Sequence, residues 1–339
     1  MIMNVALTGC GNVGRAFLEL IRDKKEQLER QYGLELRVTL VVTHRKGVVL
    51  DRGGIDLALL LKELEENGSF SSFPQASGSF EELLRLSGAR ILAEATPTNL
   101  TTGEPGLSYM RSALSMGLHV VTVNKGPLAA AWDELQALAR EHSAKFRYEG
   151  VVMSGTPLVQ MAQHGLLGCA IQKAEGILNG TTNFMLSVME AGLSFDEALA
   201  EAQKRGYAEA DPSGDLEGWD AAVKVSILAR ILFGAALPVG DVEREGITHI
   251  SGEQVRNARK HGRRIKLISG IERRSDGRLR GFVAPREVNL NSPLAGISGA
   301  SNAVTLSTDN LGEITLSGPG AGQRETAQAL LMDLIGVTE

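Results

Sequence analysis

The stretch Ile2-Met3-Asn4-Val5-Ala6-Leu7-Thr8-Gly9-Cys10-Gly11-Asn12-Val13-Gly14 decides the fold that this sequence predicts. Residues 2–7 are an apolar run typical of a short buried strand, and three glycines in a GxGxxG spacing follow directly. A helical pattern, apolar on one side, then covers residues 15–30. Residues 37–43 (RVTLVVT) predict a second buried strand. The order strand, glycine loop, helix, strand indicates a βαβ unit.

Each glycine of the loop has its own physical role in such a unit. Gly9 permits the tight turn, Gly11 lets the backbone approach a pyrophosphate, and Gly14 lets the helix pack on the strand. A plain tight turn is the alternative, but the strand before the loop and the helix after it favour a dinucleotide site. The predicted nucleotide contacts in this loop are Gly9, Gly11, Asn12, Val13 and Gly14.

The residues after the second strand bear on which nucleotide binds. An acidic side chain at this point holds the ribose 2′-hydroxyl of NAD. Here the sequence is Thr43-His44-Arg45-Lys46, with no carboxylate before Asp51. Basic residues favour the 2′-phosphate of NADP, and Arg45 is its best partner. We therefore expect NADP, with NAD as the alternative.

The composition is that of an ordinary globular protein, and it excludes several functional classes. The chain has 339 residues, 43% hydrophobic and 22% charged, enough for about two domains. A net charge of −5 gives no basic footprint for nucleic acid, and no apolar run approaches the ~20 residues of a membrane span. Only Cys10 and Cys169 are present, which fits a reducing cytoplasm, and no Cys/His cluster indicates zinc. We expect a cytoplasmic protein without nucleic-acid or membrane partners.

The pattern of predicted elements changes along the chain. Strands and helices alternate through the first 143 residues, which predicts a mostly parallel sheet covered on both faces. Helices expected after that cover residues 158–168, 184–191, 195–205 and 217–233, with a loop at 179–183. Residues 258–315 are strand-like, and a Gly-rich turn at 318–322 opens a last helix with an anion-friendly start. We predict an α/β protein: a discontinuous Rossmann-type nucleotide-binding domain (1–143 and 318–339) and an α+β catalytic and dimerisation domain (144–317).

Residues 206–224 (GYAEADPSGDLEGWDAAVK) concentrate carboxylates beside a lysine. Asp220 and Lys224 are four residues apart in a predicted helix, so they project from the same face. A carboxylate beside an amine near a nicotinamide suits hydride transfer to a carbonyl coupled to proton transfer. From these residues alone, an ordinary surface ion pair is the alternative interpretation.

Further candidates follow buried strands. Thr96-Pro97 and Asn124-Lys125 come after successive strands, at the carboxyl ends where α/β folds place ligands. A solvated strand-end lysine is the alternative for Lys125. The glycine-punctuated turn at residues 149–157 has one acid, Glu149, and could hold a monovalent cation through oxygen ligands. An interdomain hinge is equally consistent with that turn.

Taken together, these motifs resemble homoserine dehydrogenase. The matching segments are GCGNVG (9–14), EATPTN (94–99), GLHVVTVNKGPLA (117–129), EGVVMSGTP (149–157), ILNGTTNFML (177–186) and GYAEADPSGDLEGWDAAVKV (206–225). The resemblance spans nearly the whole chain and is to the short form, without a C-terminal regulatory domain. It implies reversible NAD(P)-dependent interconversion of L-aspartate 4-semialdehyde and L-homoserine, on the route to threonine and methionine. It also implies a homodimer, with the strand-rich residues 280–317 at the interface.

The resemblance implies roles for individual residues as well. Lys224 would be the proton donor and acceptor with Asp220 beside it, and Lys125 would lie near the nicotinamide and the substrate. Glu209 and Asp220 would hold the amino-acid substrate, in a pocket lined by Asp215, Tyr207, Gly180 and Thr181. Further cofactor contacts would come from Thr96, Pro97, Lys125 and Gly322. Sodium would be bound by Glu149 and the backbone oxygens of Val152, Ser154 and Thr156.

Two other functions are consistent with a nucleotide loop. A phosphorylating aspartate-semialdehyde dehydrogenase needs a cysteine nucleophile, and the only candidate is Cys169, in an apolar run without a histidine motif. A non-catalytic nucleotide-binding sensor would have no need of an acid–base set. The carboxylates and lysine of residues 206–224 favour the homoserine dehydrogenase interpretation over both.

Overall fold

The computed structural model of the protein describes residues 1–338, in two compact units that are described separately below. The first unit comprises Met1–Val151 and the chain from Gly322 onward, and the second comprises Val152–Ala321. Residues 144–151 and 318–321 therefore lie in the opposite unit from the one that the sequence pattern predicted. The reason is strand pairing. In the first unit, β6 (Phe146–Arg147) pairs with β5 (His119–Thr122); in the second, β12 (Gly312–Pro319) pairs along its whole length with β11 (Ser301–Thr308).

A six-stranded sheet of order β3-β2-β1-β4-β5-β6 forms the centre of the first unit. The parallel strands are β1 (Ile2–Thr8), β2 (Glu35–Val42), β4 (Ile91–Glu94), β5 (His119–Thr122) and β6, and β3 (Val48–Leu50) runs antiparallel to β2. The chain continues from β1 to β2 on one side and later crosses to β4 on the other. The strand order therefore reverses beside β1, and open α/β sheets bind ligands at the carboxyl ends of strands at such a point.

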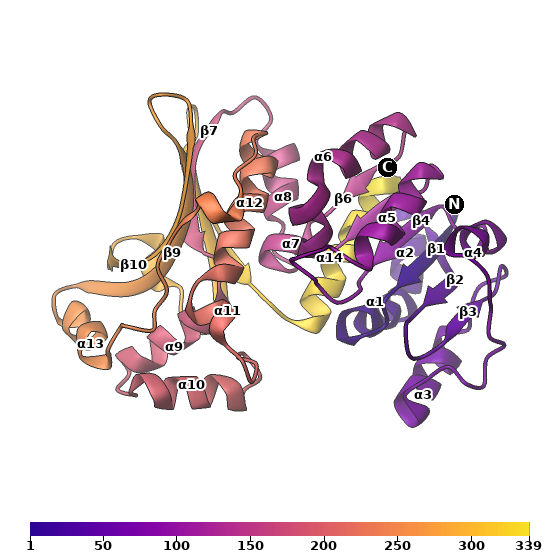
Figure 1. The fold of residues 1–339 in the computed structure, drawn as a ribbon, viewed down its shortest axis with the longest axis horizontal. Coiled ribbons are helices and arrows are strands. Elements are labelled where there is room, and N and C mark those ends of the chain that lie inside the picture. Colours follow the sequence, from indigo (N-terminus) through magenta and orange to yellow (C-terminus); the bar gives the residue numbers. More distant parts are fainter. Residues whose placement is uncertain (339) are drawn as a thin grey trace. The chain divides into compact units, whose positions relative to one another are not determined.

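Helices cover both faces of this sheet (Figure 1). One core contains side chains of α1 (Asn12–Asp23), α3 (Leu57–Asn67) and α14 (Gln323–Thr338), and the other contains those of α4 (Phe80–Ser87), α5 (Gly106–Ser115) and α6 (Lys125–Glu141). Successive residues of β1 alternate between them: Val5 and Leu7 enter the first core and Ala6 the second. Since a strand buried on both faces has no polar side, this explains the continuous apolar run. The predicted α/β fold is confirmed.

Two helices of the first unit differ from the prediction. The helix expected over residues 15–30 is two helices, α1 and α2 (Lys25–Tyr32), separated at Lys24, whose ψ is 9°. The helix expected over residues 132–142 begins earlier, as α6, because the Asn124 side chain caps the N–H of Gly126. Non-helical angles at Ala131 bend α6 there, so the prediction found only its second half.

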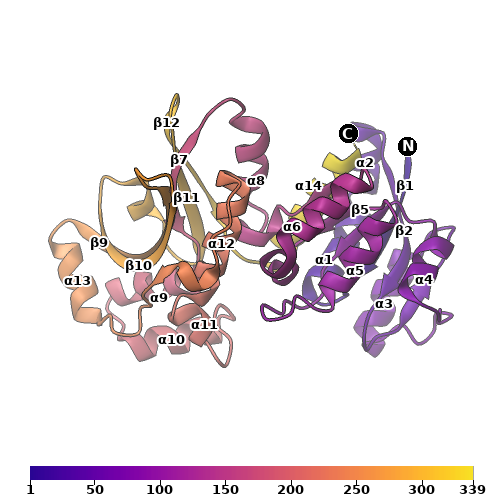
Figure 2. The same cartoon turned by 45° about the horizontal axis from the view of Figure 1, so that its top comes forward.

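The second unit is built on a sheet of order β12-β11-β7-β9-β10-β8. Neighbouring strands are antiparallel except β8 and β10; the bounds are β7 (Ile171–Ile177), β8 (Glu243–Arg244), β9 (Arg263–Arg273), β10 (Leu279–Asn289) and β11 (Ser301–Thr308). The packed helices are α9 (Gly180–Glu190), α12 (Trp219–Phe233) and α13 (Gly252–Lys260), with α10 (Phe195–Lys204) beside α9. Figure 2 shows β9 and β10 curling beside α9 and α13.

Three sequence predictions for this unit were wrong in detail. Residues 180–183 are the first turn of α9 and not a loop, because Asn179 caps the helix by accepting from the N–H of Thr182. The helix expected over residues 217–233 is interrupted at Gly218, whose φ of +82° separates α11 (Ser213–Leu216) from α12. The helix expected over residues 158–168 is shorter: α8 (Leu158–Gln160) followed by a π-helical turn, Met161–Gly165.

In the described part of the chain, no helix combines the length and apolar character needed to cross a membrane.

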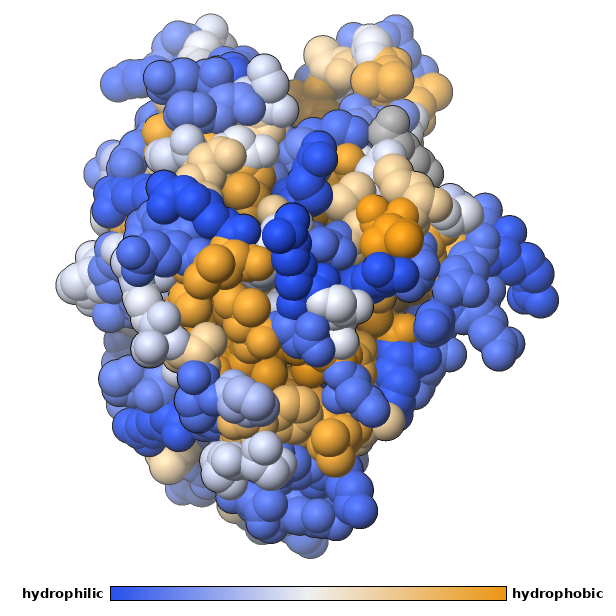
Figure 3. All heavy atoms as spheres, turned by 90° about the vertical axis from the view of Figure 1, so that its right-hand side faces the viewer, coloured by the Kyte–Doolittle hydropathy of each residue, from blue (hydrophilic) through white to orange (hydrophobic). Residues whose placement is uncertain are grey.

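Figure 3 shows a face that is mainly hydrophilic, with apolar side chains gathered near its middle. Large apolar side chains exposed in the first unit include Ile2, Tyr32 and Leu86.

Candidate active site

The glycine loop joins β1 to α1 in the first unit. The N–H of Gly9 donates to the carbonyl of Val42 (2.9 Å), and φ at Gly9 is +84°. A Cβ at Gly9 would lie 2.4 Å from the Ala95 carbonyl oxygen, and one at Gly14 would lie 2.2 Å from that of Gly9. A Cβ at Gly11, in contrast, would meet no atom within 4 Å. The loop is therefore tightly packed behind Gly9 and Gly14, and open at the glycine that is predicted to face the pyrophosphate.

The start of α1 fits an anion. Gly11 is the N-cap residue and offers no side-chain cap, so the N–H groups of Asn12, Val13 and the next residue lack a capping oxygen. Such N–H groups and the helix dipole attract phosphate. Gly322 lies at the start of α14 in the same unit, where its carbonyl accepts from the Thr326 hydroxyl (2.6 Å). The residues present thus fit a dinucleotide.

The basic turn after β2 contacts the glycine loop. Lys46 donates from Nζ to the backbone carbonyl of Cys10 (2.6 Å), while the side chain of Arg45 is exposed. Burial raises the pKa of the Cys10 thiol to about 11, outweighing the opposite effect of Lys46. Cys10 is accordingly a neutral filler of the loop and not a nucleophile.

The two strand ends that the sequence singled out are neighbours. β4 and β5 pair in register, Glu94 opposite Thr122, so Thr96-Pro97 and Asn124-Lys125 follow adjacent strands. Asn124 joins them: Nδ2 donates to the carbonyl of Thr96 (3.2 Å), and Oδ1 accepts from the N–H of Gly126 (3.1 Å). Lys125 is the first residue of α6. The predicted cofactor contacts Thr96 and Lys125 are thereby held side by side next to the reversal of strand order.

In the second unit, the buried Lys224 and the half-buried Asp220 form an ion pair in the first turns of α12. Asp220 Oδ2 lies 2.8 Å from Lys224 Nζ, and the side chains are 22% and 9% exposed. Lys224 Nζ also donates to the carbonyl of Leu178 (2.7 Å), at the end of β7. An ordinary surface ion pair, the alternative left by the sequence, does not describe this arrangement. Burying the Lys224 ammonium costs free energy unless it is paired and hydrogen-bonded, and Asp220 and the Leu178 carbonyl meet that need.

Asn179 brings the acidic segment to the end of β7. Its Nδ2 donates to Asp215 Oδ1 (2.6 Å) and to Asp220 Oδ2 (3.2 Å), while its Oδ1 caps α9. The Thr181 hydroxyl in the first turn of α9 donates to the carbonyl of Tyr207 (2.6 Å). Asn179 was not among the predicted site residues, although an Asn between a strand and a helix start is a recognisable cap signal.

The structure thus brings together Asp215, Asp220 and Lys224, with Thr181 and Tyr207 joined at one side and Gly180 next to Thr181. Tyr207 is 42% exposed, and its ring packs against that of Phe184 at an interplanar angle of 58° (centroids 5.0 Å apart). Glu209 lies on the exposed loop before α11, where its carbonyl accepts from Gln203 Nε2 (3.2 Å). The Glu209 carboxylate therefore faces solvent in this structure.

The segment predicted to bind sodium crosses the boundary between the units. Glu149 is buried in the first unit, and its N–H donates to Asp333 Oδ2 (2.7 Å). Val152, Ser154 and Thr156 belong to the second unit; Ser154 has a positive φ of 52°, and the Thr156 hydroxyl donates to the carbonyl of Pro319 (3.0 Å). Within residues 1–338, no three His, Cys, Asp or Glu side chains are grouped as a metal site.

Two family models match this chain in succession. The model of the homoserine dehydrogenase NAD-binding domain matches residues 9–149, and the model of the homoserine dehydrogenase domain matches residues 157–335. The chain belongs to the homoserine dehydrogenase family. It is an NAD(P)-dependent oxidoreductase that interconverts L-aspartate 4-semialdehyde and L-homoserine.

Similar proteins of the homoserine dehydrogenase family cover the chain almost completely. An NAD(+)-dependent homoserine dehydrogenase of Pseudomonas canavaninivorans is 45% identical over 98% of this chain and 95% of its own. A homoserine dehydrogenase of Methanocaldococcus jannaschii is 37% identical, over 99% and 98%. A homoserine dehydrogenase structure from Archaeoglobus fulgidus has a TM-score of 0.88 at 37% identity, covering 99% of both chains. A hyperthermophilic archaeal homoserine dehydrogenase in complex with NADPH has a TM-score of 0.84 at 32% identity, covering 100% and 98%.

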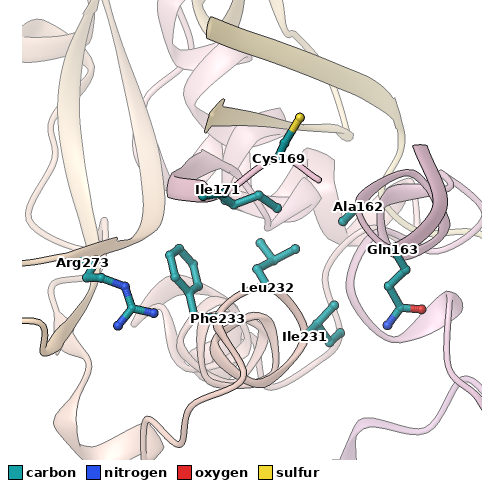
Figure 4. A pocket seen from close by; sticks show the side chains of 9 residues that line it. Ala162, Gln163, Cys169, Ile171, Ile231, Leu232, Phe233 and Arg273 are labelled. Atoms are coloured by element: carbon teal, nitrogen blue, oxygen red, sulfur yellow. The ribbon is translucent and has the colours of Figure 1, made fainter. Parts of the chain in front are cut away.

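Cys169, the nucleophile that a phosphorylating dehydrogenase would need, lies elsewhere in the second unit of this homoserine dehydrogenase. Figure 4 shows it at a pocket with Ile171 of β7, Arg273 of β9 and the last residues of α12, Ile231 to Phe233. Lys224 and Asp220 lie at the opposite end of α12. The pocket thus holds the thiol away from the acid–base pair, and the family match excludes this alternative.

The sequence analysis also did not single out Lys266, a buried lysine that contacts the first turn of α9. Lys266 of β9 is 2% exposed, and Nζ donates to Asn183 Oδ1 (2.9 Å) and to the carbonyl of Ile297 (2.5 Å). Asn183 Nδ2 in turn donates to the carbonyls of Gly299 and Ser301 (2.9 and 3.1 Å). Burial, reinforced by Arg264, lowers the pKa of Lys266 to about 8, against the opposing effect of Glu190. A lysine inside an apolar strand gives no sequence signal of this kind.

The lowered pKa of Lys266 makes the free energy of unfolding depend on pH between about 8 and 10.5. Between about pH 8 and 10.5 the unfolded chain keeps a proton that folded Lys266 has lost, so its contribution to stability rises with pH. In Lys266→Met this rise is absent. Melting temperatures of both proteins at pH 7.5 and 9.5 should therefore diverge, wild type gaining on the variant at the higher pH; equal changes in both would contradict the assignment.

Proposed function

We propose that Lys224 is the proton donor and acceptor of the homoserine dehydrogenase reaction and that Asp220 orients it. One observation carries the proposal: the Lys224 ammonium is buried and fixed by two partners, Asp220 Oδ2 (2.8 Å) and the Leu178 carbonyl (2.7 Å). These two contacts fix the position of the ammonium at the end of β7 and beside the acidic segment.

This geometry matches the demands of the chemistry. The bound nicotinamide supplies the hydride that reduces the semialdehyde carbonyl and accepts it in the reverse direction. Charge then develops on the carbonyl oxygen, and the Lys224 N–H can stabilise that charge and deliver the proton. In the oxidation of homoserine, Lys224 takes the hydroxyl proton. Lys125, at the start of α6, is proposed to act on the same substrate beside the nicotinamide.

We further propose that the acidic segment holds the amino-acid part of the substrate. Glu209 suits the substrate ammonium because its carboxylate is exposed. Asp220 contributes as well, since at 22% exposure it remains partly accessible beside Lys224. Asp215, Tyr207, Gly180 and Thr181 complete the pocket; the bonds of Asn179 to Asp215 and of Thr181 to the Tyr207 backbone keep them together.

We propose NADP as the preferred nucleotide, with its 2′-phosphate on Arg45. Support comes from the exposed guanidinium after β2 and from the absence of a carboxylate between Val42 and Asp51. One relative is named for NAD(+) and one similar structure holds NADPH, so both nucleotides occur among the proteins that resemble this chain.

Arg45→Ala tests the nucleotide preference. Losing a charge-assisted bond to a phosphate should lower kcat/KM for NADP about tenfold and leave that for NAD within about twofold. Steady-state rates of homoserine oxidation with each nucleotide, followed by the absorbance of the reduced nicotinamide, give both values. Arg22→Ala, on the exposed side of α1, is the matched control. A wild-type enzyme that prefers NAD, or an equal loss with both nucleotides, would contradict the proposal.

Four further proposals concern a bound cation, the oligomeric state, the metabolic pathway and the cellular compartment. A monovalent cation such as sodium would bind Glu149 and the backbone oxygens of Val152, Ser154 and Thr156; support comes from the burial of Glu149 and the fixing of its backbone by Asp333. The enzyme would act as a homodimer through residues 280–317. It would serve threonine and methionine biosynthesis, and it would work in the cytoplasm, since its two cysteines are both free thiols.

A further inference from the structure

Glu94, the last residue of β4, is a buried carboxylate that the proposed chemistry does not use. Its side chain is fully buried in the first unit. All its partners within residues 1–338 are neutral: the Thr96 N–H and hydroxyl, the Thr122 hydroxyl and the Asn124 amide. Burial raises the pKa of Glu94, and these hydrogen bonds oppose that rise. A buried carboxyl without a cationic partner costs free energy, so its presence calls for a role.

The carboxyl of Glu94 spans the ends of two strands. Oε1 accepts from the N–H of Thr96 (2.8 Å), from the Thr96 hydroxyl and from Asn124 Nδ2 (3.4 Å). Oε2 accepts from the hydroxyl of Thr122 (2.8 Å), the last residue of β5. Both oxygens are therefore needed: one holds the segment after β4 and the other holds the end of β5.

Two more contacts extend this arrangement to α6 and α5. Asn124 Oδ1 accepts from the N–H of Gly126, so the residue held by Glu94 also caps the helix that begins with Lys125. Gly106, the first residue of α5, packs so closely that a Cβ there would lie 3.0 Å from Glu94 Oε1. A helix N-terminus near a carboxylate stabilises its negative charge.

We infer that Glu94 is a positioning residue for hydride transfer, the shared acceptor that keeps Thr96-Pro97 and Asn124-Lys125 in one fixed arrangement. The inference rests on the role proposed above for Lys125 beside the nicotinamide and the substrate, and on the cofactor contact predicted for Thr96. Glu94 acts through these two residues and itself lies beneath them. The role depends on the reach of its two oxygens more than on their charge, because each neighbour is a neutral donor.

Two substitutions of Glu94 separate the effect of its side-chain length from the effect of its charge. Glu94→Asp keeps a carboxylate but withdraws it by one methylene, so it can no longer reach both Thr96 and Thr122. Glu94→Gln keeps the length, its carbonyl can accept from Thr96, and its amide can donate to the Thr122 hydroxyl. Glu63→Asp is the matched control: Glu63 is another buried glutamate of the first unit, it is held by Ser71 and Ser72, and it lies on α3.

The measurements are kcat for homoserine oxidation, the KM for nucleotide, the melting temperature and the primary isotope effect with homoserine deuterated at the carbon that loses hydride. Glu94→Asp should lower kcat about tenfold or more, with the nucleotide KM within about threefold. It should also raise the isotope effect, because misplacement slows the hydride step itself. Glu94→Gln should keep kcat within about threefold of wild type, and Glu63→Asp should change neither kcat nor isotope effect.

Two results would overturn the inference. One is a Glu94→Asp enzyme with a lower melting temperature but unchanged kcat and isotope effect, which is the behaviour of a structural residue. The other is a larger loss in Glu94→Gln than in Glu94→Asp, which would make charge the essential property. Thr96→Val and Lys125→Ala separate this inference from the proposed site. If both keep full kcat, the site assignment fails; if both lose it while Glu94→Asp does not, only the role of Glu94 fails.

Discussion

Lys224→Ala is expected to lower kcat for homoserine oxidation by about a thousandfold while the nucleotide still binds with nearly wild-type affinity. The expectation follows from the single buried ammonium beside Asp220 and the carbonyl of Leu178. Without it, the proposed site loses the ammonium that stabilises charge on the carbonyl oxygen and delivers the proton. The nucleotide is expected to bind the other unit, through the glycine loop, so its dissociation constant should stay within about threefold.

Lys224→Met extends this experiment, because it keeps most of the side-chain volume and removes only the amine. Both variants should be equally inactive if proton transfer is the role of Lys224, whereas loss in the alanine variant alone would indicate a packing defect. Lys204→Ala, at the exposed end of α10, is the control for removing a lysine from the same unit. Full activity in Lys224→Met would refute the assignment.

The second large effect is expected at Gly11. Gly11→Ala should raise the nucleotide dissociation constant about thirtyfold, equivalent to ~2 kcal/mol, and leave the fold intact. A Cβ at Gly11 meets no protein atom within 4 Å, so the only thing it can obstruct is a ligand approaching the start of α1. Equilibrium titration of nucleotide, by quenching of tryptophan fluorescence or by calorimetry, measures the loss.

Two other glycine variants serve as comparisons for Gly11→Ala. Gly14→Ala places a Cβ 2.2 Å from the carbonyl oxygen of Gly9, so it should lower the melting temperature and disturb the loop itself. Gly240→Ala, in a solvent-exposed turn of the second unit with open space around it, should affect neither property. Unaltered nucleotide affinity in a folded Gly11→Ala protein would mean that the pyrophosphate binds elsewhere.

The sequence predicted the first unit well because its signals are local. The glycine spacing and the alternation of strand and helix depend on residues that are neighbours in the chain, and the structure contains the βαβ unit as expected. Element ends were predicted less well, because side-chain caps decide them. Asn124 starts α6 seven residues before the predicted helix at 132, and Asn179 turns an expected loop into the first turn of α9.

In the candidate site, too, features set by neighbouring residues were predicted, and features set by distant residues were not. The spacing of Asp220 and Lys224 predicted that they share a helix face, and their 2.8 Å contact confirms it, although Gly218 interrupts the helix just before them. Nothing in the spacing indicated that Lys224 is buried and Asp220 half-buried. Residues distant in sequence hold the pair in place: the carbonyl of Leu178, after β7, accepts from Lys224, and the Asn179 amide reaches Asp220 across 41 residues of sequence. Glu94 and Lys266 were not predicted as site residues for a similar reason: Glu94 also binds Thr122 and Asn124, at least 28 residues away, and both partners of Lys266 are at least 31 residues away.

By itself, then, the sequence determined the fold class, the nucleotide loop, the family resemblance and the identity of the groups available for acid–base chemistry. Only the tertiary structure decided which of those groups are desolvated and which hydrogen bonds fix them. The physical reason is that a side chain's chemistry is set by its own atoms, whereas its burial and orientation are set by whatever packs against it. For Lys224 that neighbour is the carbonyl of Leu178, 46 residues away.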